Sequence, residues 1–247
     1  MSRILLLADV HANLVALEAV LFAAGPIGGI WVMGDTVGYG PDPSDVLALL
    51  RERRAVMVAG NHDLAVATGE GLDLFNPVAA AAARLHRSWL SAEERDLLAS
   101  LPLTRSGDTD APLAGLPFSL CHGSLRDPIW EYVFNSVQAD ATLRLATTKH
   151  CCNGHTHVPV IYREGEHAAR TAPALDVPIS LTGRCLVNPG SAGQPRDGDP
   201  RAAYALLDTV GMTVTFRRAD YAVATAQRRI RDRGLPPFLA DRLALGY

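Results

Sequence analysis

The stretch Val32-Met33-Gly34-Asp35 decides the fold that we expect for this chain of 247 residues. Residues 30–33 form a short apolar run rich in β-forming side chains, and Gly34 then lets the backbone turn, so that Asp35 leaves the carboxyl end of a strand. In open α/β sheets, binding sites form at that edge. A Gly-Asp pair on its own is more typical of an Asp that caps a turn. We interpret Asp35 as a metal ligand because other strands also end in residues that can bind metals. One carboxylate can give one oxygen to each of two ions.

Two further segments of the first 63 residues repeat this pattern of an apolar strand followed by a polar turn. Residues 3–8 lead to Asp9 and His11, and residues 55–58 lead to Gly60-Asn61-His62-Asp63. Helices are expected at residues 13–24 and 42–52, between the strands. The pattern predicts a β/α layer whose loops converge at one edge. Asp9 and His11 can face one point there, because residues two apart on an extended chain point the same way.

Two strands in the second half of the chain also end in histidines. Residues 118–121 lead to His122, and the apolar pair 151–152 leads to Gly154-His155-Thr156-His157. A lone polar turn explains a His-x-His after glycine poorly, and the spacing lets each histidine reach a different one of two adjacent metals. Further strands are expected at residues 158–162, 185–187, 202–207 and 212–217, the last two joined by a hairpin turn.

Residues 68–117 carry few candidate ligands and many helix signals. Asn76-Pro77 starts an alanine-rich helix, and Ser91 with Glu94 makes a capping box for another. We interpret this part of the chain as structure that covers the sheets. His86 lies in it without a partner motif, which is more typical of a surface or packing histidine than of a ligand.

Length and composition predict a single domain spanning residues 1–247. Hydrophobic residues make up 48% of the chain and charged residues 20%, which is typical of soluble globular proteins. The net charge of −3 gives no electrostatic basis for a nucleic-acid or anionic-membrane partner. Apolar residues 4–8 are too few for a signal peptide and no run is long enough to span a bilayer, so we expect a cytoplasmic protein. The four cysteines lack zinc-type spacing and are expected to be reduced core residues.

The candidate ligands offer carboxylate, amide and imidazole groups and no thiolate. They are Asp9, His11, Asp35, Asn61, His122, His155 and His157, with His62 beside them. Such a set suits two adjacent divalent ions, which lie roughly 3.5–4 Å apart in two-metal hydrolases. Two carboxylates against two dications leave a net charge of about +2, which attracts an anionic phosphate and makes bound water acidic. The set therefore predicts hydrolysis of a phosphate ester.

Five ordered motifs resemble the calcineurin-like metallophosphoesterase superfamily. They are Asp9-Val10-His11, Gly34-Asp35, Gly60-Asn61-His62-Asp63, His122-Gly123 and Gly154-His155-Thr156-His157. The later stretches Asn188-Pro189-Gly190-Ser191 and Gln194-Pro195-Arg196 further resemble compact bacterial members that act on small phosphodiesters. The resemblance implies a four-layer α/β/β/α sandwich, in which two mixed sheets lie face to face with helices outside.

The resemblance also implies roles for individual residues. One metal would be held by Asp9, His11, Asp35 and His157, and the other by Asp35, Asn61, His122 and His155. A water bridging the metals would attack phosphorus in line, and His62 would stabilise the transition state or protonate the leaving oxygen. Manganese is the ion that we expect, with iron, nickel, cobalt and zinc as alternatives.

One departure from the family pattern bears on substrate and on His62. In protein phosphatases of the superfamily, a second Asp and an Arg follow the Gly-Asp pair, and this Asp orients the catalytic histidine. This chain has Gly38 and Tyr39 at the corresponding positions. Asp63 is a candidate substitute for the orienting carboxylate. Arg126 and Arg196 are the remaining candidates for contacts with phosphate, and Tyr39 and Trp130 could offer an apolar wall to a base or aryl group.

Three functions follow in order of expectation. The first is a metal-dependent phosphodiesterase that acts on small phosphodiesters or cyclic nucleotides. The second is a phosphomonoesterase or nucleotide hydrolase of the same fold. The third is a non-catalytic scaffold, as in the retromer subunit that resembles this fold. The complete ligand set disfavours this third function. The expected partner is a small phosphoester substrate.

Overall fold

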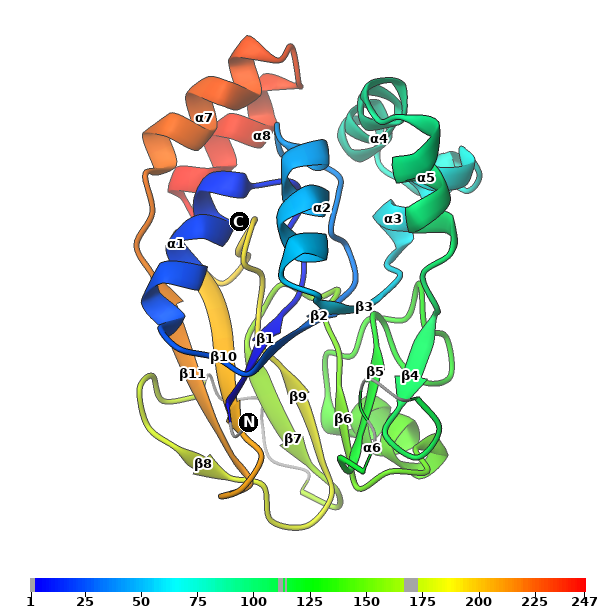
Figure 1. Cartoon of the computed structure of the whole chain (residues 1–247), viewed down its shortest axis with the longest axis vertical. Coiled ribbons are helices and arrows are strands. Elements are labelled where there is room, and N and C mark those ends of the chain that lie inside the picture. Colours follow the sequence, from blue (N-terminus) through cyan, green and yellow to red (C-terminus); the bar gives the residue numbers. More distant parts are fainter. Residues whose placement is uncertain (1–2, 111–112, 114, 167–172) are drawn as a thin grey trace.

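The computed structural model describes residues 3–110, 113, 115–166 and 173–247. In this part of the chain, a six-stranded and a five-stranded sheet lie face to face, with helices outside them (Figure 1). The predicted four-layer arrangement of two mixed sheets flanked by helices is confirmed.

The six-stranded sheet places the first predicted strand in its middle. Strand β1 (Arg3–Leu7) runs parallel to β2 (Gly29–Met33), which runs parallel to β3 (Val56–Val58). On its other side, β1 pairs antiparallel with β10 (Ala202–Asp208), followed by β11 (Thr213–Ala219) and β8 (Ile179–Ser180). The carboxyl ends of β1, β2 and β3 therefore lie side by side.

The five-stranded sheet brings the histidine-bearing strands together. Strands β5 (Phe118–Cys121), β6 (His150–Cys152) and β9 (Cys185–Asn188) run parallel at its centre. Strands β4 (Thr104–Ser106) and β7 (Val160–Arg163) pair antiparallel at the two edges. Strand β7 begins two residues later than expected, after Pro159, because proline cannot donate a hydrogen bond to the ladder.

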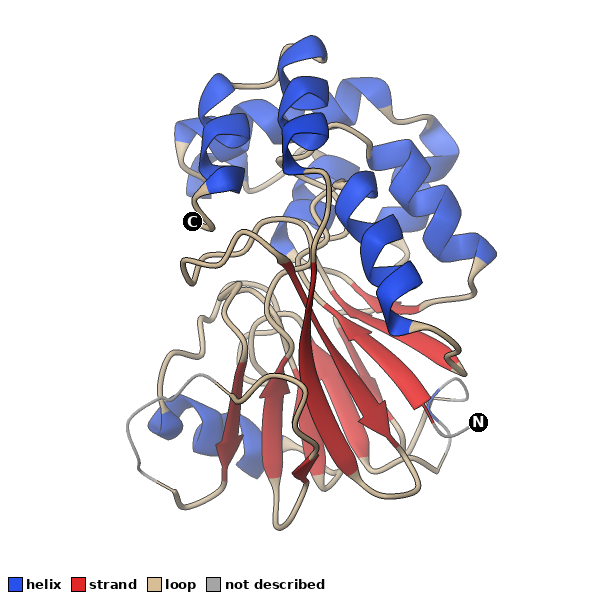
Figure 2. Ribbon diagram, turned by 90° about the vertical axis from the view of Figure 1, so that its left-hand side faces the viewer, coloured by secondary structure: helices blue, strands red, loops and turns tan. Residues whose placement is uncertain are grey.

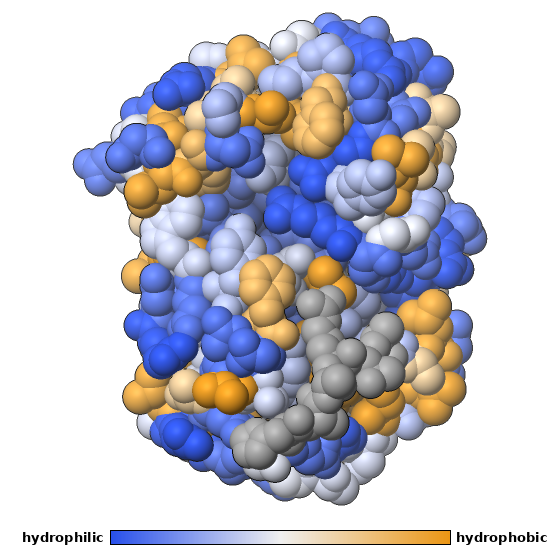
Figure 3. Space-filling view, turned by 180° about the vertical axis from the view of Figure 1, so that it is seen from behind, coloured by the Kyte–Doolittle hydropathy of each residue, from blue (hydrophilic) through white to orange (hydrophobic). Residues whose placement is uncertain are grey.

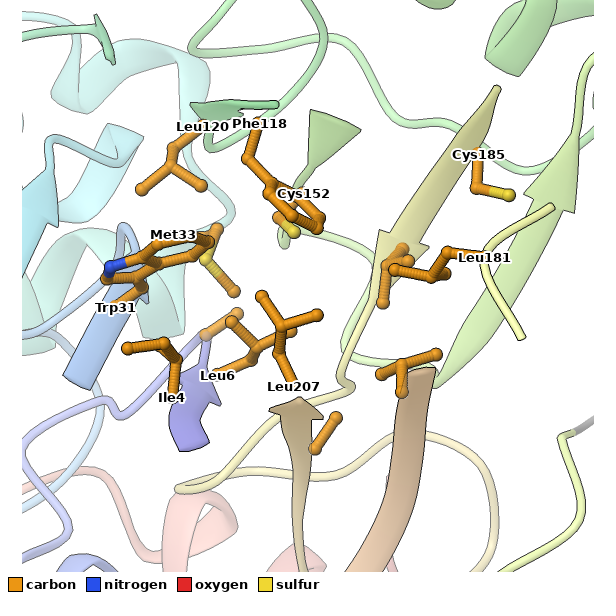
Figure 4. Close-up of a cluster of buried hydrophobic side chains, with 14 of the residues drawn as sticks. Ile4, Leu6, Trp31, Met33, Phe118, Leu120, Cys152, Leu181, Cys185 and Leu207 are labelled. Carbon is orange, nitrogen blue, oxygen red and sulfur yellow. The ribbon is translucent and has the colours of Figure 1, made fainter. Parts of the chain in front are cut away.

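The main core lies between the two sheets. In β1, Ile4 and Leu6 point into this layer, whereas Leu5 and Leu7 belong to the core on the opposite face. Burial of both faces explains why the strand reads as one continuous apolar run. Figure 4 shows side chains from both sheets meeting in this layer, and the rings of Trp31 and Phe118 lie edge to face with centroids 5.5 Å apart.

Helices cover both outer faces. Helices α1 (Leu14–Ala24) and α2 (Pro43–Glu52) pack on the six-stranded sheet, and Asn13 caps α1 by accepting the amide hydrogen of Ala16. Helix α6 (Ser136–Leu145) packs on the five-stranded sheet. All four cysteines are free and buried, as predicted.

The remaining helices gather at one end of the molecule, above the sheets in Figures 1 and 2. They are α3 (Asn61–Thr68), α4 (Pro77–Trp89), α5 (Ala92–Ala99), α7 (Val223–Asp232) and α8 (Pro237–Asp241), with short 3₁₀ turns at Leu72–Leu74 and Arg242–Ala244. Asn76 caps α4, and Ser91 and Glu94 form the predicted capping box of α5.

None of the helices among the described residues is long and apolar enough to cross a bilayer. Seen from behind, apolar residues are scattered in small groups among hydrophilic ones (Figure 3).

Candidate metal centre

The structure brings all seven predicted ligands together where the strands of both sheets end. Asp9 and His11 follow β1, Asp35 follows β2, and Asn61 opens α3 directly after β3. The second sheet contributes the three histidines that follow β5 and β6. The side chains of the whole set are at most 5% exposed. Converging polar groups in an otherwise apolar interior mark a site rather than packing.

Four of these residues form a first group of potential ligand atoms, all within 4.8 Å of one another: Asp9, His11, Asp35 and His157. His11 Nε2 lies 3.1 Å from His157 Nε2, and His157 Nε2 lies 3.2 Å from Asp9 Oδ1. Asp35 Oδ2 completes the group at 3.6 Å from His11 Nε2.

A second group shares Asp35 with the first. His122 Nε2 lies 3.4 Å from Asp35 Oδ2, 2.9 Å from His155 Nδ1 and 3.1 Å from Asn61 Oδ1. Asp35 Oδ1 instead accepts a hydrogen bond from the backbone N–H of His62 at 2.9 Å. Asp35 Oδ2 thus faces a histidine of each group, whereas Oδ1 is engaged by the backbone of His62.

The two groups fit divalent ions. Two ligands that bind one ion at about 2.1 Å and at right angles are about 3.0 Å apart, close to the 2.9–3.2 Å between several of these atoms. Three histidines are also oriented for coordination, because Nδ1 of His11, His122 and His157 donates to a backbone carbonyl. Each Nε2 is then unprotonated and faces the centre, which is the usual arrangement around a bound metal.

The backbone of the centre is strained. Five of the seven candidate ligands have a positive φ although none is glycine: Asp9 at 52°, His11 at 49°, Asp35 at 53°, His155 at 68° and His157 at 58°. Side chains adopt this left-handed region rarely, and such residues gather at functional sites. The fold thus holds these side chains in place against a local preference for other conformations.

Burial also makes the centre unfavourable for charge when no cation is bound. It raises the pKa of Asp35 to about 8, and burial together with the Asp35 charge raises the pKa of Asp9 well above its ordinary value. Burial lowers the pKa of His122 to about 4 and of His155 to about 2, so that these imidazoles stay neutral. The positive charge of Arg196 opposes the rise in the pKa of both carboxyls without cancelling it, and a divalent ion would supply further compensating charge.

Adding Mn²⁺ to metal-free protein should therefore raise the midpoint of thermal unfolding. At a free concentration of about 100 Kd, one site adds about 2.7 kcal/mol to the free energy of unfolding, which corresponds to a shift of roughly 5–10 °C for a chain of this size. Thermal scans of chelator-treated protein with and without Mn²⁺ measure the shift. The Asp35→Asn variant serves as the control and should respond much less, and an unchanged midpoint in the natural protein contradicts the expectation.

His62 lies beside the ligands, but the carboxylate proposed to orient it points elsewhere. Asp63 accepts the backbone N–H groups of Val37 at 3.1 Å and Gly60 at 2.9 Å, so the expectation that Asp63 substitutes for the family's orienting carboxylate is wrong. Aromatic packing holds His62 instead. The centroid of its ring lies 4.4 Å from Tyr39, 4.6 Å from Phe75 and 4.9 Å from His11.

Gly38 explains why the orienting Asp is absent from its usual position. A Cβ added to Gly38 would lie 2.3 Å from His62 Nδ1, and the φ of Gly38 is +91°. The imidazole thus occupies the space that a side chain at position 38 would need. With His62 in this position, a residue larger than glycine at position 38 would force a shift.

The Gly38→Ala substitution should consequently displace His62. With the catalytic role that the family resemblance implies for His62, we expect kcat to fall by up to about a hundredfold, the usual effect of moving a catalytic group by about 1 Å. Metal content should equal that of the natural protein, because the added Cβ would meet His62 and none of the candidate ligands. Turnover and elemental analysis of the same sample measure both quantities. Gly25→Ala is a matched control, since Gly25 has a φ of +65° with no atom within 4 Å of the added Cβ. Equal losses in the two variants would assign the effect to backbone strain alone.

His86 supports the loop that carries Tyr39, a role that its sequence context did not reveal. Its Nδ1 accepts the N–H of Gly38 at 3.0 Å, and its Nε2 donates to the carbonyl of Gly40 at 2.7 Å. Tyr39 lies between these anchors with a φ of 59°. Burial lowers the pKa of His86 to about 4, which keeps the neutral form that both hydrogen bonds need.

A cavity of about 120 Å³ opens above the two ligand groups. Tyr39, Trp130 and Arg196 line it, as do Leu74, Phe75, Asn76 and Tyr132, which the sequence analysis missed. The Tyr132 ring stacks on that of His155, with centroids 3.8 Å apart and planes 17° apart. All four lie outside the ligand motifs, and the sequence indicated only a helix-capping role for Asn76.

The two candidate arginines are placed differently. Arg196 lines the cavity, with its Nη2 3.4 Å from the Tyr39 hydroxyl and 3.2 Å from Gln194 Oε1. Arg126 is absent from the lining, and its guanidinium pairs with the Glu131 carboxylate. The structure thus brings only Arg196 of this pair to the cavity.

Comparisons with known proteins identify the family to which this arrangement belongs. The sequence model described as "Calcineurin-like phosphoesterase superfamily domain" matches residues 2–212. The protein MJ0912 of Methanocaldococcus jannaschii is 32% identical over 248 residues, which cover 99% of this chain and 98% of that protein. The crystal structure of a metallophosphoesterase from Sphaerobacter thermophilus superposes with a TM-score of 0.89 at 43% identity, covering 100% of this chain and 99% of that one. Protein PH1004 of Pyrococcus horikoshii shares the fold, with a TM-score of 0.81 at 20% identity and coverage of 100% and 99%.

Proposed function

Because this chain belongs to the calcineurin-like phosphoesterase superfamily, we propose that it is a phosphodiesterase with a dinuclear metal site that hydrolyses small phosphodiesters or cyclic nucleotides. The observation that carries the proposal is the Asp35 carboxylate, which two groups of ligands share at the base of one cavity. We further propose manganese as the native metal and the cytoplasm as the location.

Each residue of the site has a role in this proposal. Asp9, His11, Asp35 and His157 would hold one ion, and Asp35, Asn61, His122 and His155 would hold the other. When bound, the ions supply positive charge that polarises a phosphoryl oxygen and makes water acidic. His62, held between aromatic rings beside the ligands, would donate a proton to the leaving oxygen.

The charge of the cavity favours a diester. Among the described residues that line it, Arg196 carries the one guanidinium. A monoester dianion requires more positive donors than a diester monoanion, because more charge must be neutralised when it leaves water. Tyr39, Phe75 and Trp130 provide aromatic walls that suit an aryl group or a nucleobase.

One observation supports the alternative of a phosphomonoesterase or nucleotide hydrolase. Arg196 does reach the cavity, and a guanidinium there could neutralise the second charge of a monoester. The choice between the two functions therefore depends on how much of the rate Arg196 provides.

We expect bis(p-nitrophenyl) phosphate to be hydrolysed faster than p-nitrophenyl phosphate when the protein is loaded with Mn²⁺. Both substrates release the same leaving group, so their rates compare the diester with the monoester directly, and 2′,3′-cyclic nucleotides can be tested beside them. Arg196→Ala should weaken monoester hydrolysis more than diester hydrolysis, while Arg126→Ala is the matched control outside the cavity. A clear preference for the monoester would remove the diesterase proposal. Parallel assays with iron, nickel, cobalt and zinc test the choice of metal.

A further inference from the structure

A second depression of about 280 Å³ lies beside the cavity of the metal centre. We call it the α3 groove, because α3 supplies Leu64, Ala65 and Thr68 to its wall. Glu70 and Ile129 line it as well. The lining is mainly apolar, unlike the histidine-rich cavity next to it.

The α3 groove and the cavity share three lining residues: Asn61, Leu74 and Trp130. Trp130 is held in place by Phe75, because their rings lie edge to face with centroids 5.4 Å apart. Asn61 belongs to the second ligand group, through the contact of its Oδ1 with His122. A molecule whose phosphorus lies over the metal centre can thus extend in two directions, into the cavity and into the groove.

The two spaces differ in their proton donors. His62 lines the cavity and is absent from the lining of the groove. If His62 protonates the leaving oxygen, the leaving arm of a diester lies in the cavity, and the groove is free for the arm that stays on phosphorus. A monoester has no such second arm.

The composition of the α3 groove indicates which arm it takes. Of the described residues in its lining, Glu70 is the charged one, and no lysine or arginine accompanies it. A carboxylate beside apolar walls disfavours an anionic group and accepts a neutral one. The indole of Trp130 offers a flat face or edge to an aromatic ring.

From these observations we propose that the α3 groove binds the retained ester arm of a phosphodiester, and that this arm is a neutral aryl or nucleoside group. The proposal rests on the phosphodiesterase function proposed above. In this proposal Thr68, Glu70 and Trp130 determine specificity. These residues take no part in the chemical step.

The test compares two substrates that differ only in the retained arm, phenyl p-nitrophenyl phosphate and methyl p-nitrophenyl phosphate, with the Mn²⁺-loaded protein. Thr68 is exposed in the wall of the groove, so Thr68→Trp fills the groove with an indole. We expect this variant to lower the phenyl-to-methyl ratio of kcat/KM by about tenfold, mainly through KM. Ser88→Trp, on an exposed position of α4, should keep the ratio of the natural protein. Thr68→Ala controls for the lost hydroxyl contacts with Leu64 and Glu70.

A second variant tests the charge of the groove without filling it. Glu70→Lys should raise kcat/KM for 4-carboxyphenyl p-nitrophenyl phosphate relative to the phenyl substrate by about fivefold, because it replaces repulsion by attraction. This result decides the proposal even if Thr68→Trp fails to fold. An unchanged ratio in folded Thr68→Trp, or an unchanged charge preference in Glu70→Lys, overturns the groove assignment. A natural protein that cleaves p-nitrophenyl phosphate and neither diester overturns the diesterase function instead.

Discussion

Asp35→Ala is expected to remove both metal ions and to abolish hydrolysis. Asp35 Oδ2 lies within 3.6 Å of a histidine nitrogen in each ligand group, and no other carboxylate of the described residues belongs to both groups. Loss of the shared carboxylate would leave each group with one candidate ligand fewer and would remove negative charge that both ions would need nearby. Since metal ions supply several kcal/mol of transition-state stabilisation, turnover should fall by roughly a thousandfold or more.

Elemental analysis of protein saturated with Mn²⁺, combined with the diester assay, measures both effects. The natural protein should hold two ions per chain and Asp35→Ala close to none. Asn61→Ala should retain about one ion, because Asn61 contacts only the second group. Asp96→Ala, which removes an exposed carboxylate on α5, should keep both ions. One ion or none in the natural protein, or full activity in Asp35→Ala, contradicts a dinuclear centre.

His62→Ala is expected to lower turnover by roughly two to four orders of magnitude, the usual contribution of general acid–base catalysis. Its imidazole is buried beside both ligand groups without belonging to either. It lies against Tyr39 and Phe75, two aromatic walls of the cavity. Metal content should therefore stay near two ions per chain while the rate falls.

The choice of substrate makes this experiment specific to the leaving group. A diester with a poor leaving group such as phenol needs protonation more than one that releases p-nitrophenol, so His62→Ala should reduce its hydrolysis more. The Phe75→Leu variant keeps the imidazole while loosening its packing, and should cause a smaller loss. If His62→Ala loses metal together with activity, His62 acts on the ligands and not on the leaving oxygen.

The convergence of the candidate metal ligands could be predicted from sequence because these residues follow apolar strands directly. The carboxyl ends of neighbouring parallel strands must lie together, so the position of Asp35 or His122 in the chain largely determines its position in space. The same argument predicted α4 and α5 from their caps. These features depend on local sequence and on one simple rule of sheet geometry.

The surroundings of His62 could not be predicted in this way. Asp63 is its neighbour in sequence, yet the carboxylate of Asp63 bonds two backbone amides, and the packing of His62 comes from Tyr39 and Phe75 in other loops. His86 supports Tyr39 across 46 residues, through its hydrogen bond with Gly40. Arg126 and Arg196 look alike in sequence, but Glu131 lies close enough to pair with the first. Such contacts depend on how loops pack, which no local pattern encodes.

The left-handed backbone at five candidate ligands makes the choice of residue at these positions energetically costly. Each residue held in that region costs of order 1–3 kcal/mol, and glycine would adopt the same conformation without the penalty. If these five residues held nothing, glycine would be the more stable residue at each position. The chain has aspartate or histidine at all five instead, which favours a ligand-binding role over that of a passive scaffold.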